Sequence, residues 1–139
     1  MIRVVLDTNV LVAGLMSRDG ATAELLRRVG AYSGIQPTLS VPLVFEYEAA
    51  LKRKLGSDDT RIAAILDYLC LVGERRDICF LWRPFLRDAG DEMVLEVAVG
   101  AAASMIVTHN VRDFANVEEK FKIRVVTPGA VLLELEGMR

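Results

Sequence analysis

The chain has 139 residues, of which 53% are hydrophobic and 26% are charged, and its formal net charge is −2. This composition is typical of a globular protein and excludes a disordered one, and the length fits one domain, residues 1–139. The mild acidity gives no overall case for a nucleic-acid binder, although a local basic patch would still allow one.

The sequence carries no sign of a membrane span or a signal peptide. No apolar run reaches 18 residues, so we expect no spanning helix. The apolar run at the N-terminus is short and is interrupted by Asp7, which is not typical of a signal peptide. We therefore expect a cytoplasmic protein without a membrane partner.

Nitrogen and sulfur ligands for metals are scarce in this chain. Cys70 and Cys79 are the two cysteines, and we expect them to be reduced, buried thiols. His109 is the single histidine. These residues are too few for a typical structural zinc site, so any metal would be held by oxygen.

The opening run, residues 2–6, is apolar and rich in β-branched side chains, which predicts a strand buried on both faces. It ends at Asp7, Thr8 and Asn9. Ligands of open α/β sheets bind beyond the carboxyl ends of the strands, which would place Asp7 in a binding site. An aspartate that merely starts a turn explains the same tripeptide equally well.

Helical and extended patterns alternate along the rest of the chain. Residues 10–16 continue apolar, and breaks follow at residues 17–20, at Pro37 and at residues 73–76. We predict a loop with a short helix at 113–120, helices at 21–32, 43–55, 61–71, 91–103 and 128–136, and strands at 39–41, 78–81, 105–107 and 123–126. Such alternation indicates an α/β fold, a parallel sheet with helices on both faces.

Polar side chains recur at the predicted strand ends and helix starts. They are Asp7, Asn9, Glu46, Asp88, Asp91, Asn110 and Asp113. Each alone is explained by a helix cap, a turn or a solvated face. Together, two carboxylates about 4 Å apart repel by about 4 kcal/mol at an effective dielectric of about 20, so a cluster requires a cation. Mg²⁺ prefers oxygen ligands, and a hydrated metal can activate water and neutralise a phosphoryl oxygen.

Four segments resemble the PIN-domain family in order and spacing, namely residues 6–10 (LDTNV), 40–55, 87–114 and 125–132. The sequence is most similar to the VapC-like toxin components of bacterial toxin–antitoxin pairs. This resemblance implies a three-layer α/β/α fold with a central parallel sheet of four or five strands. It also implies a Mg²⁺- or Mn²⁺-dependent endoribonuclease that cleaves RNA phosphodiesters by metal-activated water, with an antitoxin protein as partner.

The resemblance also assigns roles to individual residues. Asp7, Glu46 and Asp91 match the family's acidic metal-binding triad, and Ala98 follows Asp91 at the family's spacing. Asn110 stands where many members carry a fourth aspartate, a departure that brings the second metal into question and makes Asp113 the fourth catalytic and metal-binding residue. The residues expected to support the site are Thr8, Asn9, Asp88, Thr108 and Asn110.

RNA binding would require cations at the rim of the site. The candidates are Arg18, Lys52, Arg53, Lys54, Arg83, Arg87 and Arg112. His109 lies beside the expected cleft, where either proton transfer or an ordinary contact to substrate or backbone is open to it, and the contact is the favoured role. Aromatic residues are only 6% of the chain, so extensive base stacking is not expected.

Two other enzyme or binding classes fit less well. Phosphoryl transfer on an aspartate requires an acidic pair at the end of the first strand and usually a downstream catalytic lysine, whereas this strand ends in Leu6-Asp7-Thr8-Asn9. A nucleotide-binding module requires a glycine-rich phosphate loop, and the sequence has none. A non-catalytic PIN-fold module that binds RNA or protein remains the alternative, because Asn110 weakens the site. The apolar excess, a mean hydropathy of +0.33, and the apolar residues 62–71 predict a homodimer.

Overall fold

The computed structural model describes residues 2–30, 34–77 and 85–137. Its centre is a five-stranded sheet in the order β3-β2-β1-β4-β5, in which all neighbouring strands are parallel. The strands are β1 (Ile2–Leu6), β2 (Ile35–Leu39), β3 (Glu74–Arg75), β4 (Met105–Val107) and β5 (Arg124–Val126).

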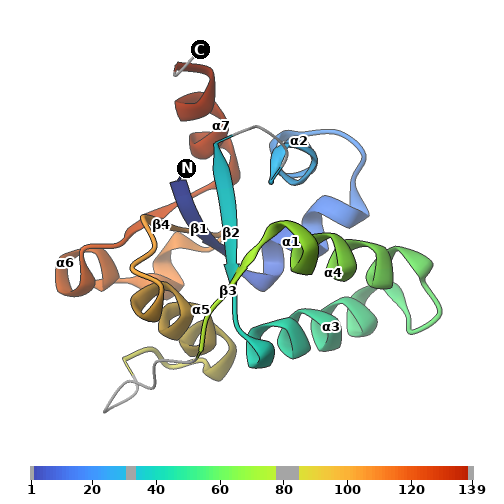
Figure 1. Cartoon of the computed structure of the whole chain (residues 1–139), viewed down its shortest axis with the longest axis horizontal. Helices are drawn as coiled ribbons and strands as arrows, with labels where there is room; N and C mark the ends of the chain where they lie inside the picture. The colour runs from blue at the N-terminus through green and yellow to red at the C-terminus, as the bar shows by residue number, and fades with distance from the viewer. Residues whose placement is uncertain (1, 31–33, 78–84, 138–139) are drawn as a thin grey trace.

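Helices cover both faces of this sheet (Figure 1). One layer holds α1 (Thr8–Met16), α2 (Ala21–Arg28), α3 (Val41–Leu55) and α4 (Thr60–Val72), and the other holds α5 (Ala89–Gly100) and α6 (Val117–Phe121). A 3₁₀ helix, η1 (Val111–Phe114), precedes α6, and α7 (Pro128–Gly137) packs against α2. Crossovers between parallel strands are right-handed, so the direction in which the chain moves along the sheet decides which face its helices cover. The chain moves in one direction from β1 to β3 and in the opposite direction from β3 to β5, so the two sets of connecting helices lie on opposite faces. The predicted three-layer α/β/α fold is confirmed, with five strands.

The central strand β1 is deeply buried at its carboxyl end. Val4, Val5 and Leu6 are almost fully buried in the core, because helices cover both faces of the strand. This placement of β1 puts Asp7, the next residue, at the middle of the sheet's carboxyl edge.

Side-chain caps set where the helices around this edge begin. Asp7 accepts a hydrogen bond from the Thr8 N–H and caps α1, and Asp88 accepts one from the Asp91 N–H and caps α5. Ser40 caps α3 through the Leu43 N–H. These caps satisfy backbone N–H groups that have no partner inside their own helices.

The structure corrects three of the sequence predictions. The second strand is 35–39 rather than 39–41, and Pro37 lies within it instead of marking a break. β3 begins opposite Thr38, so among the described residues no strand on that side pairs with Pro37, which has no N–H to donate. Residues 74–75, predicted as a turn, form β3. Cys70, predicted to be buried, is exposed on α4.

The other predicted elements are reproduced with small shifts of their ends. The apolar run at 10–16 belongs to α1, and the helix predicted at 21–32 ends at Arg28. The strand predicted at 78–81 and Cys79 lie outside the described residues. Within the described ranges, no helix combines the length and the apolar character that crossing a membrane requires.

One buried hydrogen bond ties α3 to β1 directly beside Asp7. The Tyr47 hydroxyl donates to the Leu6 carbonyl oxygen at 2.5 Å, and both residues are buried. Because Glu46 precedes Tyr47 and Asp7 follows Leu6, this bond fixes the helix that carries one carboxylate against the strand that carries the other.

Replacing Tyr47 with Phe should lower the free energy of unfolding by about 1–3 kcal/mol, because the buried Leu6 carbonyl loses its hydroxyl partner. Urea denaturation measures the change. Tyr68→Phe is the matched control: its hydroxyl donates to the Val29 carbonyl at 2.5 Å in a partly buried position, where water can replace it. Equal losses in the two variants would contradict a special role for the Tyr47 bond.

Candidate active site

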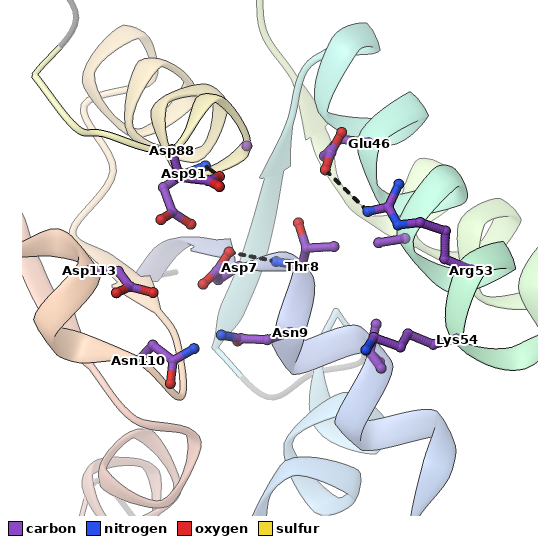
Figure 2. A pocket seen from close by; sticks show the side chains of 13 residues that line it. Asp7, Thr8, Asn9, Glu46, Arg53, Lys54, Asp88, Asp91, Asn110 and Asp113 are labelled. Atoms are coloured by element: carbon purple, nitrogen blue, oxygen red, sulfur yellow. Dashed lines mark hydrogen bonds and ion pairs between the residues drawn. The ribbon is translucent and has the colours of Figure 1, made fainter.

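A cavity of about 320 Å³ lies beyond the carboxyl ends of the central strands (Figure 2). Asp7, directly after β1, contributes to its walls together with α1, α3, the start of α5 and the region after β4. The lining residues are Asp7, Thr8, Asn9, Val12, Glu46, Ala50, Arg53, Lys54, Asp88, Gly90, Asp91, Asn110 and Asp113.

The cavity brings together most of the residues that the sequence singled out. All four predicted metal-binding carboxylates, Asp7, Glu46, Asp91 and Asp113, line it, as do four of the five predicted supporting residues, Thr8, Asn9, Asp88 and Asn110. The fifth, Thr108, is buried and contacts Asp7 directly.

The predicted basic rim is only partly at the cavity. Arg53 and Lys54 line it. Arg112 instead lines a neighbouring surface hollow with His109, Asn110 and Asp113. Arg18, Lys52 and Arg87 are exposed but do not line the cavity, and Arg83 lies outside the described residues.

Asp7 is held from two sides by hydrogen bonds. The Thr108 hydroxyl donates to Asp7 Oδ2 at 2.7 Å, and the Thr8 N–H donates to Oδ1 at 2.8 Å. The Thr108 oxygen also accepts from the Asn110 N–H at 3.0 Å and from the Asn9 side-chain amide at 3.4 Å. The carboxylate therefore has one orientation, set by the residues that follow β1 and β4.

One wall of the cavity is acidic and consists of Asp7, Asp88, Asp91 and Asp113. Two of these residues, Asp7 and Asp91, have raised pKa values. Burial raises the pKa of Asp7, which is only 4% exposed, against the lowering effect of its bonds to Thr108 and Thr8, and the Asp113 and Asp88 carboxylates raise it further. The pKa of Asp91 rises from 3.8 to about 7, because of burial first and then the charges of Asp7, Asp88 and Asp113. Negative charge in this wall is thus poorly compensated by the protein itself.

Gly90 allows the start of α5 to approach α3 closely, and sequence reasoning missed it. A Cβ atom on Gly90 would lie 3.0 Å from Asp88 Oδ1 and 3.3 Å from Glu46 Oε1. The signal in the sequence was the glycine between Asp88 and Asp91, at a position where a helix start would otherwise favour a side chain.

Glu46 lies beside a cation of its own helix. Its Oε1 is 3.9 Å from Arg53 Nη2, whereas Asp7, Asp88, Asp91 and Asp113, whose charges act on one another, lie to the left of this pair in Figure 2. The cavity therefore has an acidic wall and, on α3, a mixed wall in which Glu46 is paired.

The carboxylates of the cavity fit a divalent cation chemically, although their present arrangement does not form a coordination site. Across the described part of the chain, no group of three or more His, Cys, Asp or Glu side chains is arranged to hold a metal ion. Burial and neighbouring carboxylates nevertheless raise the pKa values of Asp7 and Asp91, and carboxylate oxygens are the ligands that hard divalent cations prefer. Asp7 and Asp91, with Asp113 beside them, would hold the ion, and Glu46 would have to leave Arg53 to join them.

Two further polar residues lie beside the cavity. The His109 ring Nε2 is 2.9 Å from the Thr22 hydroxyl, and its backbone N–H donates to the Asn9 side chain at 3.3 Å. Glu92, the residue after Asp91, was not among the predicted site residues; it is buried and accepts from the N–H groups of Phe85 and Leu86. His109 thus joins α2 to the end of β4, and Glu92 fixes the approach to α5.

Comparison with known proteins agrees with this fold and these motifs. The sequence model of the family described as the PIN domain matches residues 3–112. No curated protein sequence matches the chain. Since the family match covers most of its length, the chain belongs to the PIN-domain family, as the sequence motifs predicted.

Two solved structures have the same fold. One is VapBC2 from Rickettsia felis, bound to a DNA fragment from its promoter, with 12% identity and a TM-score of 0.57. The other is VapBC-1 from nontypeable Haemophilus influenzae, with 13% identity and a TM-score of 0.59. Each match covers 91% of this chain and 98% of the other.

The raised pKa of Asp91 makes the stability of the metal-free protein depend on pH. Between the ordinary value of 3.8 and about 7, the folded state holds a proton that the unfolded chain has lost. Asp91 therefore stabilises the fold as the pH falls below about 7, and this contribution disappears as the pH rises through that value. We expect Asp91→Asn, in EDTA, to raise the melting temperature at about pH 8 and to flatten its rise between about pH 8 and about pH 5.

Asp67→Asn is the control, because Asp67 is exposed on α4 and lies outside the cavity. Calorimetric scans across this pH range in EDTA measure both variants. The same flattening in Asp67→Asn, or an unchanged profile in Asp91→Asn, would contradict the assignment.

Proposed function

We propose that this protein is a Mg²⁺- or Mn²⁺-dependent endoribonuclease and the toxin component of a toxin–antitoxin pair. The observation that carries the proposal is the convergence of Asp7, Glu46, Asp91 and Asp113, from four separate segments of the chain, on one open cavity. PIN domains are in general nucleases that use divalent metal ions, and the family match supports the same chemistry here.

In the proposed reaction, phosphodiester cleavage, the residues of the cavity have different roles. A divalent cation, when bound, supplies an acidified water and neutralises charge on the phosphoryl oxygens. Asp7, Asp91, Asp113 and Glu46 would hold this cation, and Thr108 and the Thr8 N–H keep the Asp7 carboxylate in place. Asn110 and Asp88 orient the neighbouring groups, and Arg53 and Lys54 attract the RNA backbone.

The antitoxin partner is proposed from the sequence resemblance to VapC-like toxins and from the VapBC proteins that share the fold. The homodimer also stays a prediction. Leu71 on α4 is 82% exposed, and Phe45 and Val41 on α3 are exposed as well. Such apolar side chains are common where protein surfaces associate.

A non-catalytic PIN-fold module that binds RNA or protein is the second candidate. It is favoured by Asn110 in place of a fourth aspartate and by a cavity that, among the described residues, does not assemble a metal site. RNA cleavage by the purified protein decides between the two. Cleavage that requires Mn²⁺ and is lost in Asp7→Asn supports the nuclease, and binding of RNA without any cleavage supports the module.

Metal should stabilise the fold, because a cation relieves the repulsion within the acidic wall. We expect Mn²⁺ or Mg²⁺ at a hundredfold excess over its dissociation constant to add about 2.7 kcal/mol to the free energy of unfolding. Thermal melting with and without metal measures this gain. The gain should vanish in Asp7→Asn, and a wild-type melting curve that does not change at millimolar metal would contradict the site.

The fourth ligand can be identified by three substitutions. We expect Asp113→Asn to slow cleavage about tenfold or more, equivalent to about 1.4 kcal/mol of transition-state stabilisation. Asp88→Asn should cost less, because the Asp88 side chain already caps α5. Asn110→Asp should preserve or raise the rate, because it adds a carboxylate beside Asp113.

Cleavage rates at saturating Mn²⁺ test these three variants together. An Asp113→Asn variant as active as the wild type, with an inactive Asp88→Asn variant, would transfer the role of fourth ligand to Asp88. The nuclease proposal would still stand in that case, because the wild-type protein would still cleave RNA.

A further inference from the structure

The pairing of Glu46 with Arg53 involves two residues that line the same cavity. They stand on one face of α3, about two helical turns apart, so the guanidinium reaches back along the helix to the carboxylate. The remaining ion pair on α3, Lys52 with Glu48 at 3.7 Å, lies outside the cavity.

The Glu46–Arg53 pair is a weak one. The 3.9 Å distance is at the long end for an ion pair, and the Arg53 side chain is 65% exposed, against 27% for Glu46. Exposed pairs of this kind contribute at most about 1 kcal/mol. A ligand that competes for Glu46 can therefore separate the two side chains at little cost.

The position of Arg53 makes it a competitor for Glu46. The opposite wall of the cavity contains Asp7, Asp91 and Asp113, with raised pKa values at the first two. A cation bound by Asp7, Asp91 and Asp113 would need the Glu46 carboxylate to turn from Arg53 toward them, and in the present structure that carboxylate is paired with Arg53 (Figure 2).

We propose that Arg53 is an exchangeable counter-ion: it neutralises Glu46 in the metal-free protein and, once Glu46 turns to a divalent cation, is released to bind an RNA phosphate. This inference rests on the proposed metal-dependent nuclease. A guanidinium suits both roles, because its planar set of donors matches a carboxylate and a phosphate equally well. Metal binding and RNA binding are then coupled through a single side chain.

Lys54 is the matched control for Arg53. It lines the same cavity on the same helix and has the same charge, but among the described residues it forms no ion pair. A general effect of positive charge on metal affinity would be the same for both residues. An effect that passes through Glu46 would be specific to Arg53.

The first test measures Mn²⁺ affinity by titration calorimetry, without RNA. We expect Arg53→Gln to tighten Mn²⁺ binding about two- to fivefold, the range that an exposed ion pair can supply, and Lys54→Gln to change it less. In the Glu46→Gln background, which lacks the charged partner, Arg53→Gln should have no more effect than Lys54→Gln.

The outcomes separate this inference from the proposed function. Equal tightening in Arg53→Gln and Lys54→Gln, or an Arg53 effect that persists in Glu46→Gln, would overturn the counter-ion role while the metal site stands. A wild-type protein that does not bind Mn²⁺ would overturn both. Circular dichroism of each variant confirms that it is folded.

The second test measures RNA affinity with a cleavage-resistant phosphorothioate RNA, by fluorescence anisotropy. With saturating Mn²⁺, we expect Arg53→Gln to weaken binding about threefold or more, because the released guanidinium is missing. In EDTA the variant and the wild type should differ little, since Arg53 is then paired with Glu46. Equal weakening with and without metal would show a fixed contact at the rim and would refute the exchange.

Discussion

The buried carboxylate of Asp7 is the constraint on which the rest of the site depends. Asp7 directly follows the central strand, and its carboxylate caps α1 and accepts a hydrogen bond from the Thr108 hydroxyl, at the end of the neighbouring strand. Burying a charge of this kind is costly unless it is paired or hydrogen-bonded, and here two donors offset only part of that cost. The sheet thus presents a buried acidic group whose orientation is fixed by two hydrogen bonds.

The surrounding elements increase this charge instead of neutralising it. The start of α5 brings Asp88 and Asp91 to the cavity, and the turn after β4 adds Asp113. The N-terminal end of α5 favours negative charge, since the helix dipole is positive there. Even so, the pKa of Asp91 is raised to about 7, so burial and mutual repulsion exceed the help from the helix. Carboxylates arranged in this way are the oxygen donors that a hard divalent cation favours.

Much of the fold could be predicted from the sequence because its elements have strong local signals. Buried apolar runs identified β1 and β4, and the helical pattern at 43–55 identified most of α3. The strand β3 could not be predicted in this way. It has only two residues and no apolar pattern, and it exists because β2 offers it a hydrogen-bonding edge. Its existence is a consequence of tertiary structure, which local propensity does not report.

The features of the site likewise fall into those that local sequence signals predict and those that depend on tertiary structure. Strand ends and helix starts gave the positions of Asp7, Asp91 and Asp113, because topology alone takes these positions to one edge of the sheet. The contacts that refine the site come from packing between distant segments. The Tyr47 hydroxyl on Leu6, the close approach at Gly90 and the burial of Glu92 all depend on how α3 and α5 lie against the sheet. Sequence spacing carries no record of that geometry.

Helix α3 brings side chains of both charges to the cavity. It provides Glu46, which adds to the acidic set, and also Arg53 and Lys54, the basic side chains that line the cavity among the described residues. A protein with a net charge of −2 can therefore attract a polyanion locally, since the field at the binding surface and not the total charge determines association. Both signs stand on one helix that the Tyr47 hydroxyl bonds to β1, so a shift of α3 would move Glu46, Arg53 and Lys54 together. In the proposed nuclease, α3 would therefore keep a cation ligand and the phosphate-binding groups at a fixed spacing along the helix, as positioning a phosphodiester requires.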